Sequence, residues 1–131
     1  MYSLDILVVD DQPGVRYLLQ IIINDMGHQV MTASNGLEAL EIVKVHHPDL
    51  IFMDVSMPLL NGIEALERIK VISPGSQVVL MTAYISEDTI AQAEKKGALK
   101  CFAKPFDIEE LKIFLYNFEW HRANNAEKIG S

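Results

Sequence analysis

The sequence predicts an α/β domain with a doubly wound, five-stranded parallel sheet, and three observations support that prediction. Short apolar runs alternate five times with segments in which apolar residues recur at helical spacing. Most of the runs are continuously apolar, which is typical of strands covered by helices on both faces of a sheet. Right-handed crossovers then favour the strand order 2-1-3-4-5.

The five expected strands end at chemically distinctive residues. Their ranges are about 4–9, 29–33, 49–53, 77–81 and 99–103. The first is followed by Asp10 and Asp11, the third by Asp54, the fourth by Thr82 and the fifth by Lys104. Because parallel strands end at the same edge of a sheet, these side chains are expected to border one crevice where the strand order reverses.

The starts of the first three helices carry recognisable signals. Pro13 suits the first turn of the helix that follows the first strand. Either Ser34 or Asn35 can cap the second helix, and Asn61 begins an Asn-x-x-Glu capping box for the third.

The last two helices differ in how much apolar surface they offer to a core. The fourth, capped by Ser86, is thinly apolar, and its inward candidates are Ile90, Ala91 and Ala93. Little burial predicts low local stability for this helix. The last helix is expected to bury a longer stripe, formed by Ile108, Leu111, Leu115 and Phe118.

Composition limits the class of protein. The 131 residues suit one domain, expected over residues 1–120, with a polar extension at 121–131 and no output domain. A net charge of −7 argues against nucleic acid or anionic lipid as a partner. No apolar run is long enough for a membrane span and no leader opens the chain. The single Cys101 is expected to be a core thiol in a reducing compartment.

The acids at the strand ends predict a metal site. Asp10, Asp11 and Asp54 would repel one another unless a cation neutralised them. Carboxylate oxygens without a nearby histidine or thiolate suit Mg²⁺, which commonly also holds phosphoryl oxygens. Lys104 adds a positive charge and Thr82 a hydroxyl, so Asp54 is expected to attack phosphorus and form an acyl phosphate.

Each residue also has a simpler interpretation. Asp10 or Asp11 alone could cap the next helix, and Asp54 alone could be a solvated loop acid. Lys104 alone would be a surface lysine, and Thr82 alone an ordinary strand residue. The adjacent His46 and His47 are expected at the surface, and His28 and His121 show no metal-ligand spacing. The joint position of the five strand-end residues favours the functional interpretation.

The motifs resemble a known family. The pair Asp10–Asp11, the segment from Asp54 to Gly62, Met81-Thr82-Ala83 and Lys104-Pro105-Phe106 resemble the receiver domains of bacterial two-component response regulators, whose fold is flavodoxin-like. The resemblance runs from about residue 4 to residue 118. It is strongest toward the stand-alone regulator of the sporulation phosphorelay, from which Pro13 and the polar extension depart.

The resemblance implies roles for the site residues. Asp54 would be the phosphoacceptor, and Mg²⁺, for which Mn²⁺ or Ca²⁺ can substitute, would be held by Asp10, Asp11, Asp54 and the backbone carbonyl of Ser56. Lys104 and Thr82 would contact the phosphoryl group, with a cis bond before Pro105 aiming Lys104 inward. Tyr84 matches the aromatic switch position, and Ser56 and Tyr84 flank the phosphoryl site.

The first helix has more apolar surface than its core stripe needs. Together with the segment after Lys104, it suggests a docking patch for a helical bundle that carries phosphohistidine. The expected members are Gln12, Gly14, Val15, Leu18, Ile21, Pro105 and Phe106. The alternative is that Leu18 and Ile21 are ordinary half-buried residues.

The leading hypothesis is a cytoplasmic, monomeric phosphorelay intermediate that acts through other proteins, since an output domain is not expected. It would accept a phosphoryl group from a sensor histidine kinase and pass it to a histidine phosphotransferase, in sporulation initiation. An aspartyl-phosphate phosphatase is a further expected partner. This is phosphotransferase chemistry on its own Asp54, not turnover of a substrate.

Three alternatives are open at this stage. One is a single-domain receiver that regulates a target allosterically once phosphorylated, as in chemotaxis. A second is a Mg²⁺-dependent phosphatase of the aspartyl-phosphate type, which would need an acid where Ser56 stands. A third is a flavin-binding protein of similar topology. Such a protein would need to bind the phosphate of its flavin after the first strand, where Asp10 and Asp11 would repel it.

Overall fold

Strands and helices alternate along the chain in the structure, a computed structural model that describes residues 3–130 and side chains through residue 124. The strands are β1 (Asp5–Val9), β2 (Gln29–Ala33), β3 (Leu50–Asp54), β4 (Gln77–Thr82) and β5 (Lys100–Ala103). The helices are α1 (Pro13–Asp25), α2 (Gly36–His46), α3 (Gly62–Ile72), α4 (Glu87–Lys95) and α5 (Ile108–Gly130). The predicted α/β class is confirmed.

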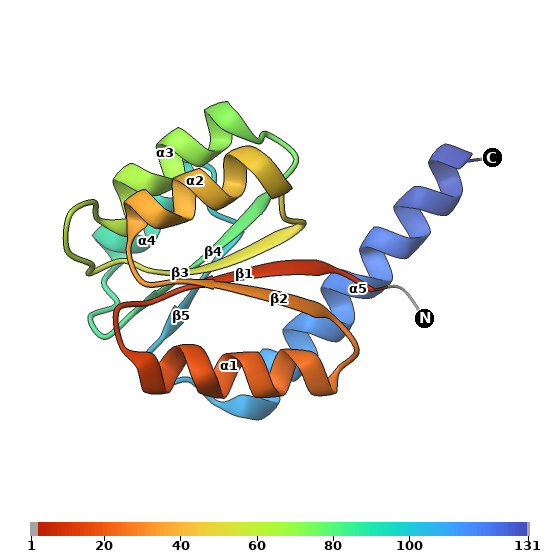
Figure 1. Ribbon diagram of the computed structural model, residues 1–131, viewed down its shortest axis with the longest axis horizontal. Helices are drawn as coiled ribbons and strands as arrows, with labels where there is room; N and C mark the ends of the chain where they lie inside the picture. Colours follow the sequence, from red (N-terminus) through yellow and green to blue (C-terminus); the bar gives the residue numbers. More distant parts are fainter. Residues whose placement is uncertain (1–2, 131) are drawn as a thin grey trace.

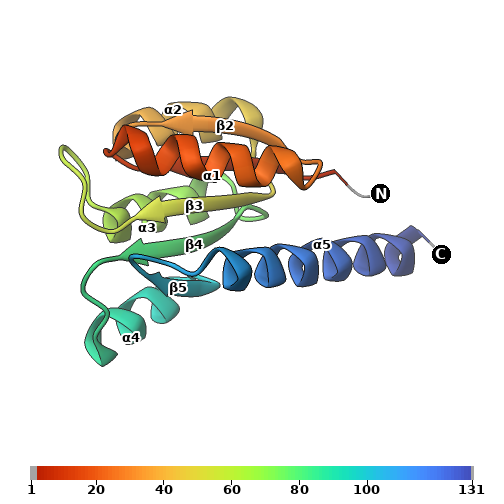
Figure 2. The ribbon, with the colours of Figure 1, turned by 90° about the horizontal axis from the view of Figure 1, so that it is seen from below.

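The strands form one parallel sheet in the order β2-β1-β3-β4-β5, as predicted. Val9 of β1 lies in register with Met53 of β3, and Thr82 of β4 with Ala103 of β5. Neighbouring strands therefore end almost level with one another. In Figure 2 the arrows of β2, β3 and β4 point the same way. Side chains that follow the strands are brought to one edge of the sheet.

Helices cover both faces of the sheet, with α1 and α5 on one face and α2, α3 and α4 on the other (Figure 1). Successive residues of a strand point to opposite faces, so continuous apolar strands fill two cores at once. Leu7 and Ile51 pack with Leu66 of α3 in one core. Ile6 and Phe52 pack with Leu19 of α1 and Leu115 of α5 in the other.

Side-chain caps fix the starts of three helices. The side chains of Asn35, Asn61 and Ser86 each accept a hydrogen bond from the backbone N–H three residues later. Asn35, not Ser34, caps α2, because the hydroxyl of Ser34 bonds instead to the carboxylate of Glu38.

Two expectations about buried residues are wrong. In α4 only Ala93 is buried, and Ala91 is exposed, because residues two apart on a helix point in opposite directions. Ile108 is 40% exposed, since it opens α5 at the edge of the sheet. Leu111 and Leu115 are buried as expected, and Phe118 is partly buried.

The last helix continues past the sheet. α5 runs on from Phe118 to Gly130 and projects from the body of the domain (Figures 1 and 2). Arg122 donates a hydrogen bond to Asp49 over 2.9 Å, and the other carboxylate oxygen of Asp49 accepts from the backbone N–H of Asp5. The start of the extension is thus anchored where β1 and β3 begin. Within residues 3–130, no helix is both long and apolar enough to cross a membrane.

Candidate functional site

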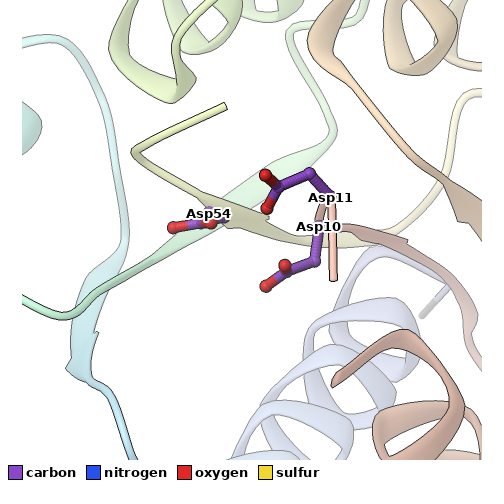
Figure 3. A group of neighbouring side chains, drawn as sticks. All are labelled: Asp10, Asp11 and Asp54. Atoms are coloured by element: carbon purple, nitrogen blue, oxygen red, sulfur yellow. The ribbon is translucent and has the colours of Figure 1, made fainter. Parts of the chain in front are cut away.

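Three carboxylates meet at the edge of the sheet where β1 and β3 end. Asp54 is the last residue of β3, and Asp10 and Asp11 directly follow β1, its neighbour in the sheet. One carboxylate oxygen from each lies within 4.8 Å of the others. Figure 3 shows the three carboxyl groups extending to the same side of the strand ends. Asp10 and Asp54 are buried, and Asp11 faces solvent.

The side chain of Asp10 is held in place from several directions. One carboxylate oxygen accepts a hydrogen bond from the backbone N–H of Gln12 over 2.9 Å. The other accepts from Nζ of Lys104 over 2.6 Å, and Arg16 donates to the backbone carbonyl of Asp10. Asp10 is therefore not the cap of α1, a position that Gln12 occupies. Its contact with Lys104 links the ends of β1 and β5.

Asp54 lies at the centre of the group. The backbone N–H of Ser56 donates to one of its oxygens over 3.3 Å, and Nζ of Lys104 lies 3.4 Å from the other. Burial raises the pKa of the Asp54 carboxyl, Lys104 opposes that rise, and the charge of Asp10 adds to it. One lysine thus neutralises only part of the negative charge.

The donor set fits a divalent cation. The three acids offer hard oxygen ligands, and one of them opens to solvent, where an ion could keep bound water. Burial and, to a smaller extent, the charge of Asp10 raise the pKa of Asp54, and a bound cation would favour its ionised form. The arrangement is therefore consistent with a divalent metal site.

Thr82 and Lys104 reach the same edge from β4 and β5. Thr82 is buried, and its hydroxyl oxygen accepts from the backbone N–H of Tyr84 over 3.1 Å. The Lys104–Pro105 bond is cis, as the family resemblance implied. The ring of Tyr84 is 84% exposed, so in this structure it points outward from the site.

The loop after Asp54 contains a feature that sequence reasoning missed. Leu59 has a positive φ of 71°, and the N–H of Leu60 bonds to the carbonyl of Pro58 over 2.8 Å. This is a γ-turn with a non-glycine residue at its centre, a conformation that costs free energy. The sequence offered Pro58 and Asn61–Gly62 as turn signals, but none of them identifies Leu59.

The residues expected to form a docking patch are divided between solvent and core. Leu18 and Ile21 are 41% and 42% exposed, and a Cβ added at Gly14 would meet nothing within 4 Å in the described part of the chain outside its own helix turn. Val15 and Phe106 are partly buried against the core beneath α1 and α5. Gln12 and Pro105 are exposed. The structure adds Tyr17, which is 67% exposed beside Ile21 and lies outside the buried stripe of α1.

Comparisons with known proteins agree on one family. Residues 6–115 match the family described as response regulator receiver domain. The chain is 47% identical over 112 residues to sporulation initiation phosphotransferase F of Bacillus subtilis, covering 86% of this chain and 90% of that protein. It is 43% identical to the transcriptional regulatory protein ZraR of Klebsiella oxytoca, of which it covers only 26%.

Solved structures show the same fold. The chemotaxis protein CheY4 of Vibrio cholerae matches with a TM-score of 0.83 and 28% identity, over 88% of this chain and 98% of that one. A receiver domain protein from Clostridium thermocellum matches with a TM-score of 0.83 and 29% identity, over 98% of this chain and 99% of that one. With the flavodoxin-like strand order and the acids at its edge, these matches show that the chain belongs to the response regulator receiver domain family.

Proposed function

We propose that this receiver domain is a stand-alone phosphorelay intermediate. It accepts a phosphoryl group from a sensor histidine kinase on Asp54 and passes it to a histidine phosphotransferase. The observation that carries the proposal is the position of Asp54, a buried carboxylate between two further acids and the ammonium group of Lys104. The 47% identity to a sporulation initiation phosphotransferase supports a role in sporulation initiation.

The chemistry is an in-line displacement at phosphorus. A carboxylate oxygen of Asp54 attacks, the P–N bond of the donor phosphohistidine breaks, and the electron pair returns to the imidazole. Lys104, 3.4 Å from Asp54, is near enough to pair with a phosphoryl oxygen, and the hydroxyl of Thr82 would donate to another. Mg²⁺, held by Asp10, Asp11, Asp54 and the carbonyl of Ser56, would supply charge neutralisation. Transfer onward is the reverse displacement, toward a second histidine.

Partner choice in this proposal depends on the patch formed by Gln12, Gly14, Val15, Leu18, Ile21, Pro105 and Phe106. Exposed Leu18 and Ile21 support it, because half-exposed aliphatic side chains on α1, the helix that follows Asp10 and Asp11, suit contact with a helical bundle. An Ile21→Asp substitution should slow transfer from the kinase by tenfold or more, about 1.4 kcal/mol. Val45→Asp, at a more exposed apolar position on α2 outside this patch, is the control and should leave transfer unchanged.

The phosphorylation site is tested by mass spectrometry after incubation with phosphoramidate and Mg²⁺. One phosphoryl group should be added, and Asp54→Asn should abolish the addition while Asp25→Asn, at an exposed acid of α1, retains it. The relay is tested by mixing radiolabelled protein with a histidine phosphotransferase. Label that leaves only to water would overturn the relay and retain the phosphoacceptor.

A second candidate function is allosteric regulation of a target by the phosphorylated form. It is favoured by α4, which buries only Ala93. Lys96, directly after the helix, forms an ion pair with Glu67 of α3. Exposed Tyr84 precedes this helix. The two functions are separated by the relay experiment above, since an allosteric regulator has no second histidine acceptor.

A further inference from the structure

A hollow of about 440 Å³ lies between α5 and the amino ends of β4 and β5. Gln77 and Lys100, the first residues of these strands, border it, so it is at the opposite end of the sheet from Asp54. Phe114, Phe118 and Leu99 give it an apolar lining. Its volume is that of a small-molecule site, because such pockets span about 300–1,000 Å³.

Two side-chain cations, Lys100 and Arg122, lie close to aromatic rings, and two of these rings, Phe114 and Phe118, line the hollow. Nζ of Lys100 lies 4.9 Å from the ring centre of Phe102 and 6.0 Å from that of Phe114. The guanidinium carbon of Arg122 lies 5.5 Å from the ring centre of Phe118. These contacts hold positive charge beside the apolar surface, since aromatic faces attract cations.

The charge of the hollow differs from that of the chain. The chain has a net charge of −7, yet among the side chains described through residue 124 no acid lines the hollow. Arg122 uses one nitrogen for Asp49, which leaves other guanidinium donors. Lys100 forms no ion pair with any residue in the described part of the chain. The local chemistry is therefore complementary to an anion with an apolar body.

We propose that this hollow binds a small amphipathic carboxylate, a molecule with one carboxylate on an aromatic or aliphatic body. Phe114 and Phe118 would contact the body, and Lys100 and Arg122 would bind the carboxylate. The site also requires α5 to continue past Phe118, since His121 and Arg122 belong to its lining.

The test uses the full chain with 4-phenylbutyrate as the probe and 4-phenylbutanol as its uncharged counterpart. Binding is measured by calorimetry and by amide chemical shifts, and the single Trp120, whose ring contacts that of His121, is a fluorescence reporter. We expect saturable binding of the acid and at least tenfold weaker binding of the alcohol. Shifts should be confined to the starts of β4 and β5 and to α5.

Variants separate this site from nonspecific attraction. Lys100→Gln should weaken binding of the acid about tenfold, as expected for one charge-assisted hydrogen bond. Lys112→Gln, at a lysine of α5 outside the hollow, should leave binding unchanged. Leu99→Trp, at a half-exposed position, should fill the hollow and abolish binding without unfolding the chain. Asp54→Asn should bind as the natural chain does, so this test is independent of the phosphorelay.

Four results would overturn the proposal. The first is equal affinity for 4-phenylbutyrate and 4-phenylbutanol. The second is an equal loss of affinity for the acid in Lys100→Gln and Lys112→Gln. The third is the absence of saturable binding at millimolar concentrations of the acid. The fourth is a change in the sedimenting mass of the ligand-free chain in Leu99→Trp, which would make this face a contact between two copies.

Discussion

Asp54 is the proposed nucleophile, and its surroundings disfavour its negative charge. It is 6% exposed, and loss of solvent is the main reason why its pKa is raised, with the charge of Asp10 adding to the effect. Lys104 and the N–H of Ser56 lower the pKa but do not cancel the rise. The ionised form that must attack phosphorus is thus the form that folding disfavours.

Replacing this carboxylate should stabilise the metal-free protein. The pKa of Asp54 is higher in the folded chain than its ordinary value of 3.8, so the folded state binds more protons just above that pH. The free energy of unfolding therefore falls as the pH rises from 3.8 through the folded-state pKa, and the loss persists at pH 7. Asp54→Asn removes this loss and should raise the urea midpoint at pH 7 without Mg²⁺.

The same unfolding curves at pH 3 provide an internal control, because Asp54 is then protonated in both states and the substitution should have little effect. Asp25→Asn, at an exposed acid, should change the free energy of unfolding by less than about 0.5 kcal/mol at either pH. A variant Asp54→Asn that is no more stable than the natural chain at pH 7 would contradict the electrostatic account.

His28 is a buried base that directly precedes β2, at the opposite end of the sheet from Asp54. Its Nδ1 accepts a hydrogen bond from the backbone N–H of Leu4 over 3.0 Å, so that nitrogen carries no proton. Nε2 has no hydrogen-bond partner within the described residues, and the carboxylate of Glu119 lies 3.8 Å from it. Burial lowers the pKa of His28 more than Glu119 raises it.

His28 should make the fold sensitive to mild acid. Its pKa in the folded chain is below the ordinary value of 6.5, so below pH 6.5 the unfolded chain binds more protons. Stability should therefore fall as the pH drops from 6.5 toward the folded-state pKa. His28→Asn can still accept from Leu4, and it should flatten this part of the pH profile, measured by urea unfolding between pH 7 and pH 5. His121→Asn should retain the slope, and an unchanged slope in His28→Asn would contradict the assignment.

The strand-end residues were predictable from sequence, and their interactions were not. Asp10, Asp54 and Thr82 each follow or end an apolar run, and parallel strands bring such residues together by geometry alone. His28 is buried beside Glu119, which is far away along the chain, and no local sequence pattern indicates this contact. The hydrogen bond from Lys104 to Asp10 likewise depends on the conformations of two side chains that are far apart in the sequence.

Among the helices, α3 is positioned by the absence of a side chain. A Cβ at Gly62, its first residue, would collide with the carbonyl oxygen of Asp54 and lie 2.8 Å from Cα of Val55. The backbone N–H of Gly62 also donates to the carbonyl of Val55 over 2.8 Å. The helix therefore begins directly against the strand end that carries the proposed phosphoacceptor.

Gly62→Ala should destabilise the domain. The colliding atoms belong to the backbone and cannot rotate away, so overpacking should cost about 1–3 kcal/mol. Gly14→Ala is the matched control, since nothing lies within 4 Å of an added Cβ and alanine favours a helix by up to about 1 kcal/mol. Thermal unfolding of both variants should give shifts of opposite sign, and equal shifts would contradict this packing argument.

Element types and order could be predicted because each strand and helix has its own period and cap signals. The end of α5 could not, because residues beyond Phe118 are polar and their helix is anchored by the distant Asp49. The inward placement of Ala91 failed for a geometric reason, since a residue two positions from Ala93 lies on the other side of the helix. The composition of α4 indicated that it contributes few side chains to the core, but it did not identify Ala93 as the buried one.

The domain brings together, from two neighbouring strands, acids that are far apart in the sequence, so metal binding and folding should be linked. A cation that binds Asp10, Asp11 and Asp54 binds only the folded chain, since the unfolded chain does not hold the three acids together. Mg²⁺ should therefore raise the free energy of unfolding, by about 2.7 kcal/mol at a concentration 100 times its dissociation constant. Thermal unfolding in MgCl₂ is compared with NaCl of equal ionic strength, which removes general screening. The double variant Asp10→Asn and Asp11→Asn should lose the response to Mg²⁺, and a response equal to that of the natural chain would place the ion elsewhere.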